Sequence, residues 1–131
     1  ADAEGLFDIK SPRVVMAGAH VDIEDYEMFI TDFSSFVFDF ACLCRPVLYF
    51  VPDYGQFKAG MNHYRELDLP FEKAFGPLVL DPDGAVEEIK KAAENGFDPE
   101  PIYAERMRSF YYPLENCAEA LYNEVSSWDC L

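Results

Sequence analysis

The chain has 131 residues, half of them hydrophobic, so we expect one folded domain over residues 1–131 rather than a disordered tail. The 25 acidic and 10 basic residues give a net charge of -15. This charge repels a phosphate backbone, so nucleic acid is excluded as an expected partner. The longest apolar runs, of which Val47–Val51 is one, are far shorter than the roughly 20 residues that span a bilayer, and we expect no membrane insertion of this segment.

The first part of the chain predicts two short strands joined through a helical turn. Residues 13–17 read as a strand that ends at Gly18. Asp22 is a candidate N-cap for a helical turn over residues 22–27, which leads into a second, buried strand over residues 28–31. These assignments follow from apolar runs bounded by turn residues.

A strand–helix–strand unit is predicted next. A helix is expected from Ser34 or Ser35 to about Leu43, because Arg45 precedes a proline and is therefore biased away from the α region. Residues 47–51 follow as a strand that is apolar throughout, as in strands covered on both faces. This order predicts a right-handed βαβ unit and a parallel sheet.

The remaining chain predicts a long loop, one more strand and three helices. Residues 53–77 are rich in aromatic side chains and show little periodicity, so we expect a loop that forms a ligand wall. Residues 78–80 read as a strand. Helices are expected from residue 81 to a stop at Asn95-Gly96, near residues 101–110, and over residues 116–127.

Local patterns refine two of these helices. Glu87 and Lys91 are spaced for an i,i+4 ion pair, and Asn116 with Glu119 resembles a capping box. The positions expected to face the core are Ala85, Val86, Ile89, Ala92 and Ala93 in the first helix, and Cys117, Ala118, Leu121, Tyr122 and Val125 in the last. The predicted fold class is α/β, a parallel sheet with flanking helices and a helical C-terminal tail.

The cysteines and histidines predict no metal site and no cofactor. Cys42, Cys44, Cys117 and Cys130 form no Cys-x-x-Cys pair and have no histidine at metal-ligand spacing, so we expect reduced cysteines in or near the core of a cytosolic protein. The two histidines, His20 and His63, are expected in surface or structural roles.

The segment Thr31-Asp32-Phe33-Ser34-Ser35 lies at the carboxyl end of a predicted parallel strand, where ligands of α/β proteins bind. The first N–H groups of the following helix lack intrahelical partners and carry about half a unit of positive charge. With the serine hydroxyls, they predict a phosphate site even on an acidic protein. Alternatively, Ser34 caps the helix and Asp32 closes the turn without any ligand. The residue pattern leaves both interpretations open.

Asp39 is expected inside the same helix. It either faces a cleft or pairs with a neighbour such as Arg45, because a buried carboxylate without a partner is costly. Acid/base chemistry by Asp32 and Asp39 is less favoured, since no histidine or third carboxylate is fixed beside them. The chain also has no Gly-x-Ser-x-Gly and no Gly-x-Gly-x-x-Gly motif. The pattern therefore assigns no catalytic residue.

The run from Thr31 to Ala41, followed by Arg45-Pro46 and Pro52-Asp53, resembles the C-terminal part of the CDP-glycerol glycerophosphotransferase family. Members carry a Thr-Asp-Tyr-Ser-Ser motif, a Phe-Asp-Phe/Tyr-Ala continuation, a Lys/Arg-Pro strand and a Pro-Asp turn in this order. The resemblance extends over residues 13–125. Here Phe33 replaces the tyrosine, the segment before the motif is shorter, and the Arg-Gly-aromatic feature after the Pro-Asp turn is not evident.

The resemblance implies a transferase of GT-B fold, in which this chain is the Rossmann-like C-terminal half. Such a transferase moves glycerol phosphate, or a related polyol phosphate, from CDP-glycerol to a teichoic-acid-type polymer. It implies that Ser34 and Ser35 contact donor phosphate and that Thr31 and Asp32 shape the turn. The chain would be the donor-binding C-terminal half, inactive alone, whose partners are the donor, the polymer acceptor and a missing N-terminal half. The expected location is cytoplasmic, with the full-length protein peripheral at the inner face of the bacterial plasma membrane.

Two other functions remain open at this point. One is the donor domain of a GT-B glycosyltransferase that uses a sugar nucleotide. The other is a stand-alone acidic domain that binds another protein through its aromatic segment over residues 54–75.

Overall fold

The computed structural model describes residues 12–14, 21–60, 67, 69–111 and 116–128, which are built around a three-stranded parallel sheet of order β1-β2-β3. The strands are β1 (Phe29–Thr31), β2 (Val47–Phe50) and β3 (Leu78–Val79). The parallel α/β fold predicted from the sequence is therefore confirmed, with each strand one residue shorter than expected. The strand predicted at residues 13–17 lies largely outside the described residues.

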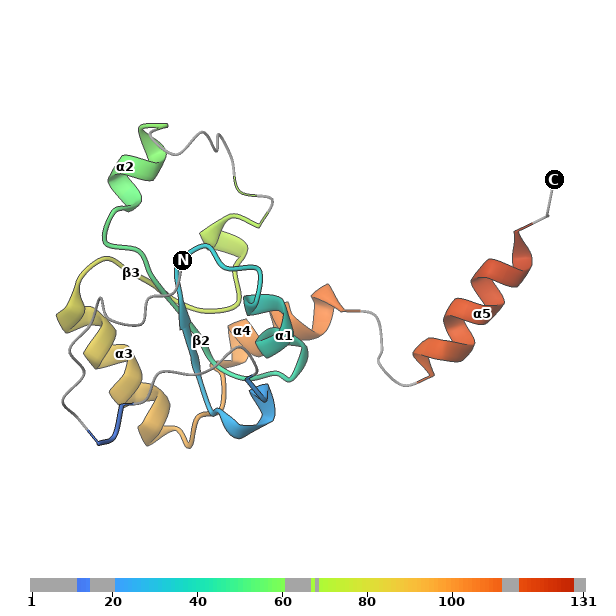
Figure 1. Cartoon of the computed structure of the whole chain (residues 1–131), viewed down its shortest axis with the longest axis horizontal. Coiled ribbons are helices and arrows are strands. Elements are labelled where there is room, and N and C mark those ends of the chain that lie inside the picture. Colours follow the sequence, from blue (N-terminus) through green and yellow to red (C-terminus); the bar gives the residue numbers. More distant parts are fainter. Residues whose placement is uncertain (1–11, 15–20, 61–66, 68, 112–115, 129–131) are drawn as a thin grey trace.

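Helices cover both faces of this sheet (Figure 1). On one side lies α3, which contacts β2 and β3, and on the other lies α1, which contacts β1, β2 and α4. The helices are α1 (Val37–Cys42), α2 (Tyr54–Lys58), α3 (Pro82–Glu94), α4 (Pro101–Phe110) and α5 (Cys117–Ser127), with two 3-10 turns, η1 (Ile23–Asp25) and η2 (Phe71–Lys73). The result is a layered α/β/α arrangement, as expected for a strand that is apolar throughout.

The main core lies on the α1 and α4 side of the sheet. Alternate residues of β2 and its extension face this side, while the intervening Leu48 is fully buried on the opposite one. The buried cluster consists of Val37, Phe40, Ala41, Val47, Tyr49, Val51, Phe71, Ala74, Phe75 and Met107. Its members come from α1, β2, the segment before β3, and α4, so the core joins elements that are far apart in the sequence.

Gly76 allows the segment before β3 to pass close to β2. A Cβ atom at this position would lie 1.8 Å from the backbone oxygen of Val47, far inside van der Waals contact. The neighbouring Ala74 carbonyl accepts a hydrogen bond of 2.9 Å from the Arg106 guanidinium of α4. Only glycine therefore permits this approach, and α4 holds the segment in place.

Several sequence predictions need correction in the second half of the chain. The segment over residues 53–77 is not a continuous loop, because it contains α2 and η2. Aromatic packing explains these short helices, since the Tyr54 ring contacts the Phe71 ring edge-on at 5.2 Å between centroids.

The boundaries of α3 follow the predicted signals. The Asp81 carboxylate accepts a hydrogen bond of 2.9 Å from the Gly84 N–H, and Gly96 ends the helix with a left-handed φ of 67°. The predicted ion pair between Glu87 and Lys91 is wrong. Lys91 pairs instead with Glu88, one turn away on the same helix. The predicted apolar stripe is only partly correct, since Ala85, Ile89 and Ala92 are half-buried whereas Val86 and Ala93 are exposed.

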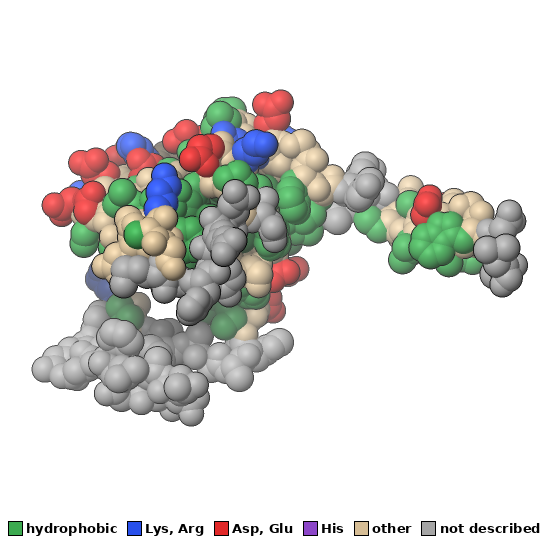
Figure 2. Space-filling model, turned by 90° about the horizontal axis from the view of Figure 1, so that it is seen from above, with side chains coloured by type: hydrophobic (Ala, Val, Ile, Leu, Met, Phe, Trp, Pro, Cys, Tyr) green, Lys and Arg blue, Asp and Glu red, His purple; other side chains and the backbone are tan. Residues whose placement is uncertain are grey.

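The C-terminal helix α5 extends away from the layered body (Figure 1), and every residue from Asn116 to Trp128 is exposed. The predicted buried side of this helix is therefore wrong: no described element covers its apolar residues. The predicted capping box is also wrong, because Asn116 has a left-handed φ of 65° and its side chain makes no capping hydrogen bond. Hydrophobic atoms dominate the visible surface of α5 in Figure 2.

Within the described residues, no helix combines the length and the hydropathy needed to cross a bilayer.

Candidate functional site

The chain leaves β1 through a tight turn, residues 31–36, which we call the serine turn. Thr31 ends the strand and is buried, whereas Asp32, Ser34 and Ser35 are exposed. The carbonyl oxygens of Ser34 and Ser35 accept hydrogen bonds of 3.3 and 3.1 Å from the N–H groups three residues later. Because this tight turn precedes it, α1 begins at Val37, later than the sequence predicts.

The serine turn presents hydrogen-bond donors that are not used within the protein. The Ser34 hydroxyl oxygen accepts a hydrogen bond of 3.3 Å from the Phe36 N–H. Ser34 therefore caps this local turn and not the helix α1 itself. In the part of the chain that the structure describes, the N–H groups of Ser34 and Ser35 and the Ser35 hydroxyl have no hydrogen-bond partner. These exposed donors suit an anionic ligand.

A hollow of about 200 Å³ lies against this turn at the carboxyl ends of the strands. It is lined by Asp32, Phe33, Ser34, Ser35, Val37, Phe38, Tyr49, Leu67 and Leu69. The fold thus brings together the serine turn, the middle of β2 and the segment before η2. Apolar side chains line much of the hollow, and the serine donors stand beside them.

Tyr49 is the residue of this hollow that the sequence reasoning missed. Its side chain is only 5% exposed, and its buried hydroxyl has no hydrogen-bond partner among the described residues. Burial raises the pKa of Tyr49, and the nearby Phe75 backbone opposes that shift without forming a hydrogen bond of ordinary geometry. A tyrosine within an otherwise apolar strand was the available signal, and it was interpreted only as a core residue.

Aromatic side chains pack together beside the turn. The Phe33 ring stacks on Phe57 of α2 with centroids 4.5 Å apart, and the Lys58 ammonium lies 4.8 Å from the centre of the Tyr54 ring. The aromatic segment that was predicted to form a ligand wall therefore contacts the serine turn through Phe33.

The predicted carboxylates do not form a pair at this site. Asp32 lines the hollow, whereas Asp39 is not among its lining residues and is exposed on α1. Of the two alternatives left open for Asp39, the pairing with Arg45 is wrong, because this guanidinium binds Glu27 at 2.8 Å. Within the described ranges, no cluster of three metal-ligating side chains occurs. His20 and His63 lie outside those ranges.

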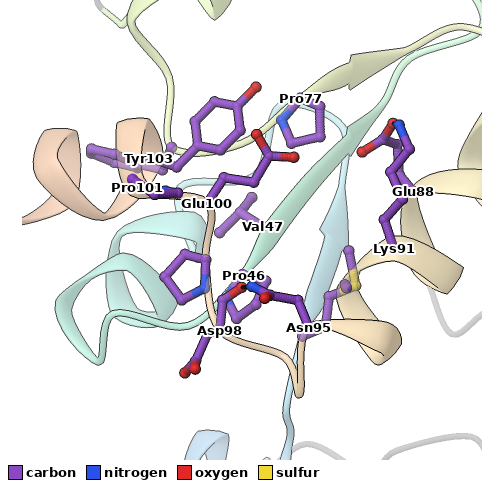
Figure 3. Close-up of a pocket in the computed structure, with 14 residues that line it drawn as sticks. Pro46, Val47, Pro77, Glu88, Lys91, Asn95, Asp98, Glu100, Pro101 and Tyr103 are labelled. Carbon is purple, nitrogen blue, oxygen red and sulfur yellow. Dashed lines mark hydrogen bonds and ion pairs between the residues drawn. The ribbon is translucent and has the colours of Figure 1, made fainter.

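A second, larger cavity of about 260 Å³ lies at the opposite edge of the sheet (Figure 3). Pro46 and Pro77, which precede β2 and β3, form part of its wall. Its other polar lining residues include Glu88, Lys91, Asp98, Glu100 and Tyr103. The only cation among them is already paired with Glu88, and burial and the Glu100 carboxylate raise the pKa of Tyr103. This acidic cavity disfavours an anionic ligand, although it is the larger of the two.

Comparisons with known proteins agree on one family. The profile of the CDP-glycerol:poly(glycerophosphate) glycerophosphotransferase family matches residues 8–127. Teichoic acid poly(glycerol phosphate) polymerases of Bacillus subtilis (strain 168) and Bacillus spizizenii are 44% identical over 66 residues and 36% identical over 97 residues. These matches cover 50% and 70% of this chain, but only 8% and 22% of the two relatives.

One solved structure also matches, that of the wall teichoic acid polymerase TagF. The match has a TM-score of 0.47 and 20% sequence identity, and it covers 81% of this chain and 28% of that one. The chain thus spans less than a quarter of the length of the two curated Bacillus relatives that it matches.

Proposed function

Because this chain belongs to the CDP-glycerol:poly(glycerophosphate) glycerophosphotransferase family, we propose that it is the donor-binding part of a transferase that uses CDP-glycerol. The complete enzyme would move glycerol phosphate, or a related polyol phosphate, to a cell-wall or capsular polymer. The names of the relatives support this proposal, since they are polymerases of teichoic acid poly(glycerol phosphate). The full-length protein would work in the cytoplasm, at the inner face of the bacterial plasma membrane.

The observation that carries the proposal is the set of unused donors in the serine turn. The protein has a net charge of -15, so long-range attraction does not hold an anionic donor. Short-range hydrogen bonds from the Ser34 and Ser35 N–H groups and the Ser35 hydroxyl supply the binding instead. Thr31, buried at the end of β1, and Asp32 shape the turn that aims these groups.

These donors have a defined role in the transfer. A hydroxyl of the acceptor attacks the phosphorus that carries glycerol, the bond from this phosphorus to the bridging oxygen breaks, and CMP leaves with the bonding electron pair. The proton of the attacking hydroxyl passes to a general base of the complete enzyme. Hydrogen bonds from the serine turn to the diphosphate stabilise the negative charge that builds up on the leaving group.

The size of the hollow supports the binding of only part of the donor by this chain. Pockets that enclose a whole small molecule measure roughly 300–1,000 Å³, whereas this hollow measures about 200 Å³. It is suited to the diphosphate, and the remaining part of the enzyme, a Rossmann-like N-terminal half in a GT-B arrangement, would contact the acceptor. We therefore expect little or no transferase activity from this chain alone.

Calorimetric titration of the chain with CDP-glycerol, CDP and a UDP-sugar tests the proposal. We expect CDP-glycerol and CDP to bind and the UDP-sugar to bind more weakly. If none of the three binds at millimolar concentration, the donor-site proposal is wrong. A clear preference for the UDP-sugar would instead support a glycosyltransferase.

A further inference from the structure

The hydroxyl of Tyr49 is an unexplained polar group beneath the proposed donor site. It is buried, and although the Phe75 backbone lies near enough to oppose the rise in its pKa, it has no hydrogen-bond partner of ordinary geometry within the described residues. Burying a hydroxyl without a partner lowers folding stability, and native proteins satisfy the large majority of such groups. A phenylalanine would fill the same space without that cost. The hydroxyl therefore calls for an explanation other than packing.

The position of Tyr49 in the sheet connects it to the serine turn. Its Cα is paired with that of Thr31, the residue that begins the turn. In a parallel sheet, paired residues point to the same face, so Tyr49 and Thr31 share the α1 side. Tyr49 also lines the same hollow as Ser34 and Ser35. The phenol thus lies on the side of the sheet from which the serine donors approach a ligand.

The other walls of the hollow restrict access to the hydroxyl. The Phe71 ring packs edge-on against the Tyr49 ring at 5.1 Å, and this contact fixes one side. Leu67 and Leu69, which line the hollow, are only half-buried. The hydroxyl itself is closed off from solvent, so a ligand reaches it only after a side chain that covers it moves.

We propose that Tyr49 is a ligand-binding residue whose hydroxyl donates its missing hydrogen bond to a phosphate oxygen of the nucleotide diphosphate held by Ser34 and Ser35. The inference rests on the proposed function and adds to it a residue from β2. Ligand entry therefore includes a movement of the side chains that cover the hydroxyl. The raised pKa of Tyr49, which burial causes, keeps the phenol protonated and able to donate.

The substitution Tyr49→Phe tests this inference, because the inference predicts that the variant is more stable than the wild type but binds the ligand more weakly. The variant should unfold at a higher temperature than the wild type, by roughly a few degrees, because the unsatisfied hydroxyl is gone. It should bind CDP about tenfold more weakly in calorimetric titration, since one hydrogen bond to a charged group is lost. Tyr122→Phe, which removes an exposed hydroxyl on α5, is the matched control and should change neither quantity.

The outcomes separate this inference from the proposed function. If the wild type binds CDP and Tyr49→Phe binds it equally well, the inference is wrong while the donor site stands. A variant that is less stable than the wild type, or that does not fold, shows that the hydroxyl serves the structure and also overturns the inference. If the wild type binds neither CDP nor CDP-glycerol, the proposed function fails and the inference fails with it.

Discussion

The two hollows at opposite edges of the sheet differ in chemistry more than in size. The cavity at the amino ends of the strands is the larger, yet its walls carry three carboxylates and one lysine that is already ion-paired. The hollow at the carboxyl ends is smaller, and it combines one carboxylate with the unused donors of the serine turn. For a ligand that carries phosphate, the available donors decide between the two sites, and cavity volume does not.

The topology explains why the donors gather at one edge. Parallel strands all end at the same side of the sheet, so the turn after β1 and the chain after β2 meet there. At the other edge, β2 and β3 begin after Pro46 and Pro77, which have no N–H to offer a ligand. The amino edge therefore lacks these two backbone donors, whereas the carboxyl edge presents the unused donors of the serine turn.

The largest predicted effect tests the packing role of the amino edge. Gly76→Ala places a Cβ atom 1.8 Å from the Val47 carbonyl oxygen, and backbone must move to relieve the clash. We expect a loss of at least about 3 kcal/mol in the free energy of unfolding, measured by urea denaturation. Gly55→Ala, at a helical glycine where a Cβ meets nothing within 4 Å, is the control and should be neutral or stabilising. Similar stability of both variants would contradict the packing argument.

The next effect concerns binding at the carboxyl edge. The double substitution Ser34→Ala and Ser35→Ala removes both hydroxyls, and we expect CDP-glycerol to bind at least about tenfold more weakly in calorimetric titration. Both side chains are exposed, so the free energy of unfolding should change by less than about 1 kcal/mol. Ser109→Ala, in which an exposed hydroxyl that donates to the Arg106 carbonyl is removed, should bind as the wild type does. Equal affinities in all three proteins would exclude the serine hydroxyls from the site.

A smaller effect concerns the anchor of α1 beside the same hollow. The Tyr111 hydroxyl donates a hydrogen bond of 2.6 Å to the Phe38 carbonyl, and burial is the main cause that raises the pKa of Tyr111 to about 12. The folded state thus holds this proton more tightly than the unfolded chain, whose tyrosines titrate near 10. The contribution to stability is complete below pH about 10 and is lost as the pH rises toward 12.

Denaturation of the wild type and of Tyr111→Phe at a series of alkaline pH values measures this contribution. The variant should lose less stability than the wild type between pH about 10 and 12. If both proteins show the same pH dependence, the hydroxyl does not couple proton binding to folding in the way proposed here.

The smallest expected effect concerns the amino-edge cavity, which we expect to take no part in donor binding. Glu100→Gln removes a carboxylate from the amino-edge cavity, far from the serine turn along the strands. We expect CDP-glycerol affinity to change by less than about twofold, because the surface charge is screened by salt over this separation. A large gain in affinity from this single neutralisation would indicate that the ligand binds at the amino edge.

The sequence predicted those parts of the fold that depend on local signals. The apolar run after Pro46 identified β2, and Asp81 and Gly96 marked the ends of α3. The serine turn was identified from its place between a strand and a helix. In each case, residues adjacent in the chain determine the result, so no knowledge of the tertiary structure was needed.

The features that were missed depend on contacts between distant segments. Tyr49 is indistinguishable from a core residue until β2 is placed beside the serine turn, and only then does its unpartnered hydroxyl become visible. The apolar positions of α5 predict a face that is normally covered, but a helical pattern does not say which element covers it. Glu87 and Glu88 are both within reach of Lys91 on a helix, and side-chain conformation alone selected Glu88.

The central claim is that the carboxyl edge, and not the larger cavity, binds the donor. NMR spectroscopy of the isotope-labelled chain during titration with CDP-glycerol tests it most directly, because each backbone amide reports on its own surroundings. We predict that the largest shifts occur at the amides of Ser34, Ser35 and Phe36, while those at residues 95–103 stay unchanged. Shifts concentrated at residues 95–103, or no shifts at saturating ligand, would contradict the claim.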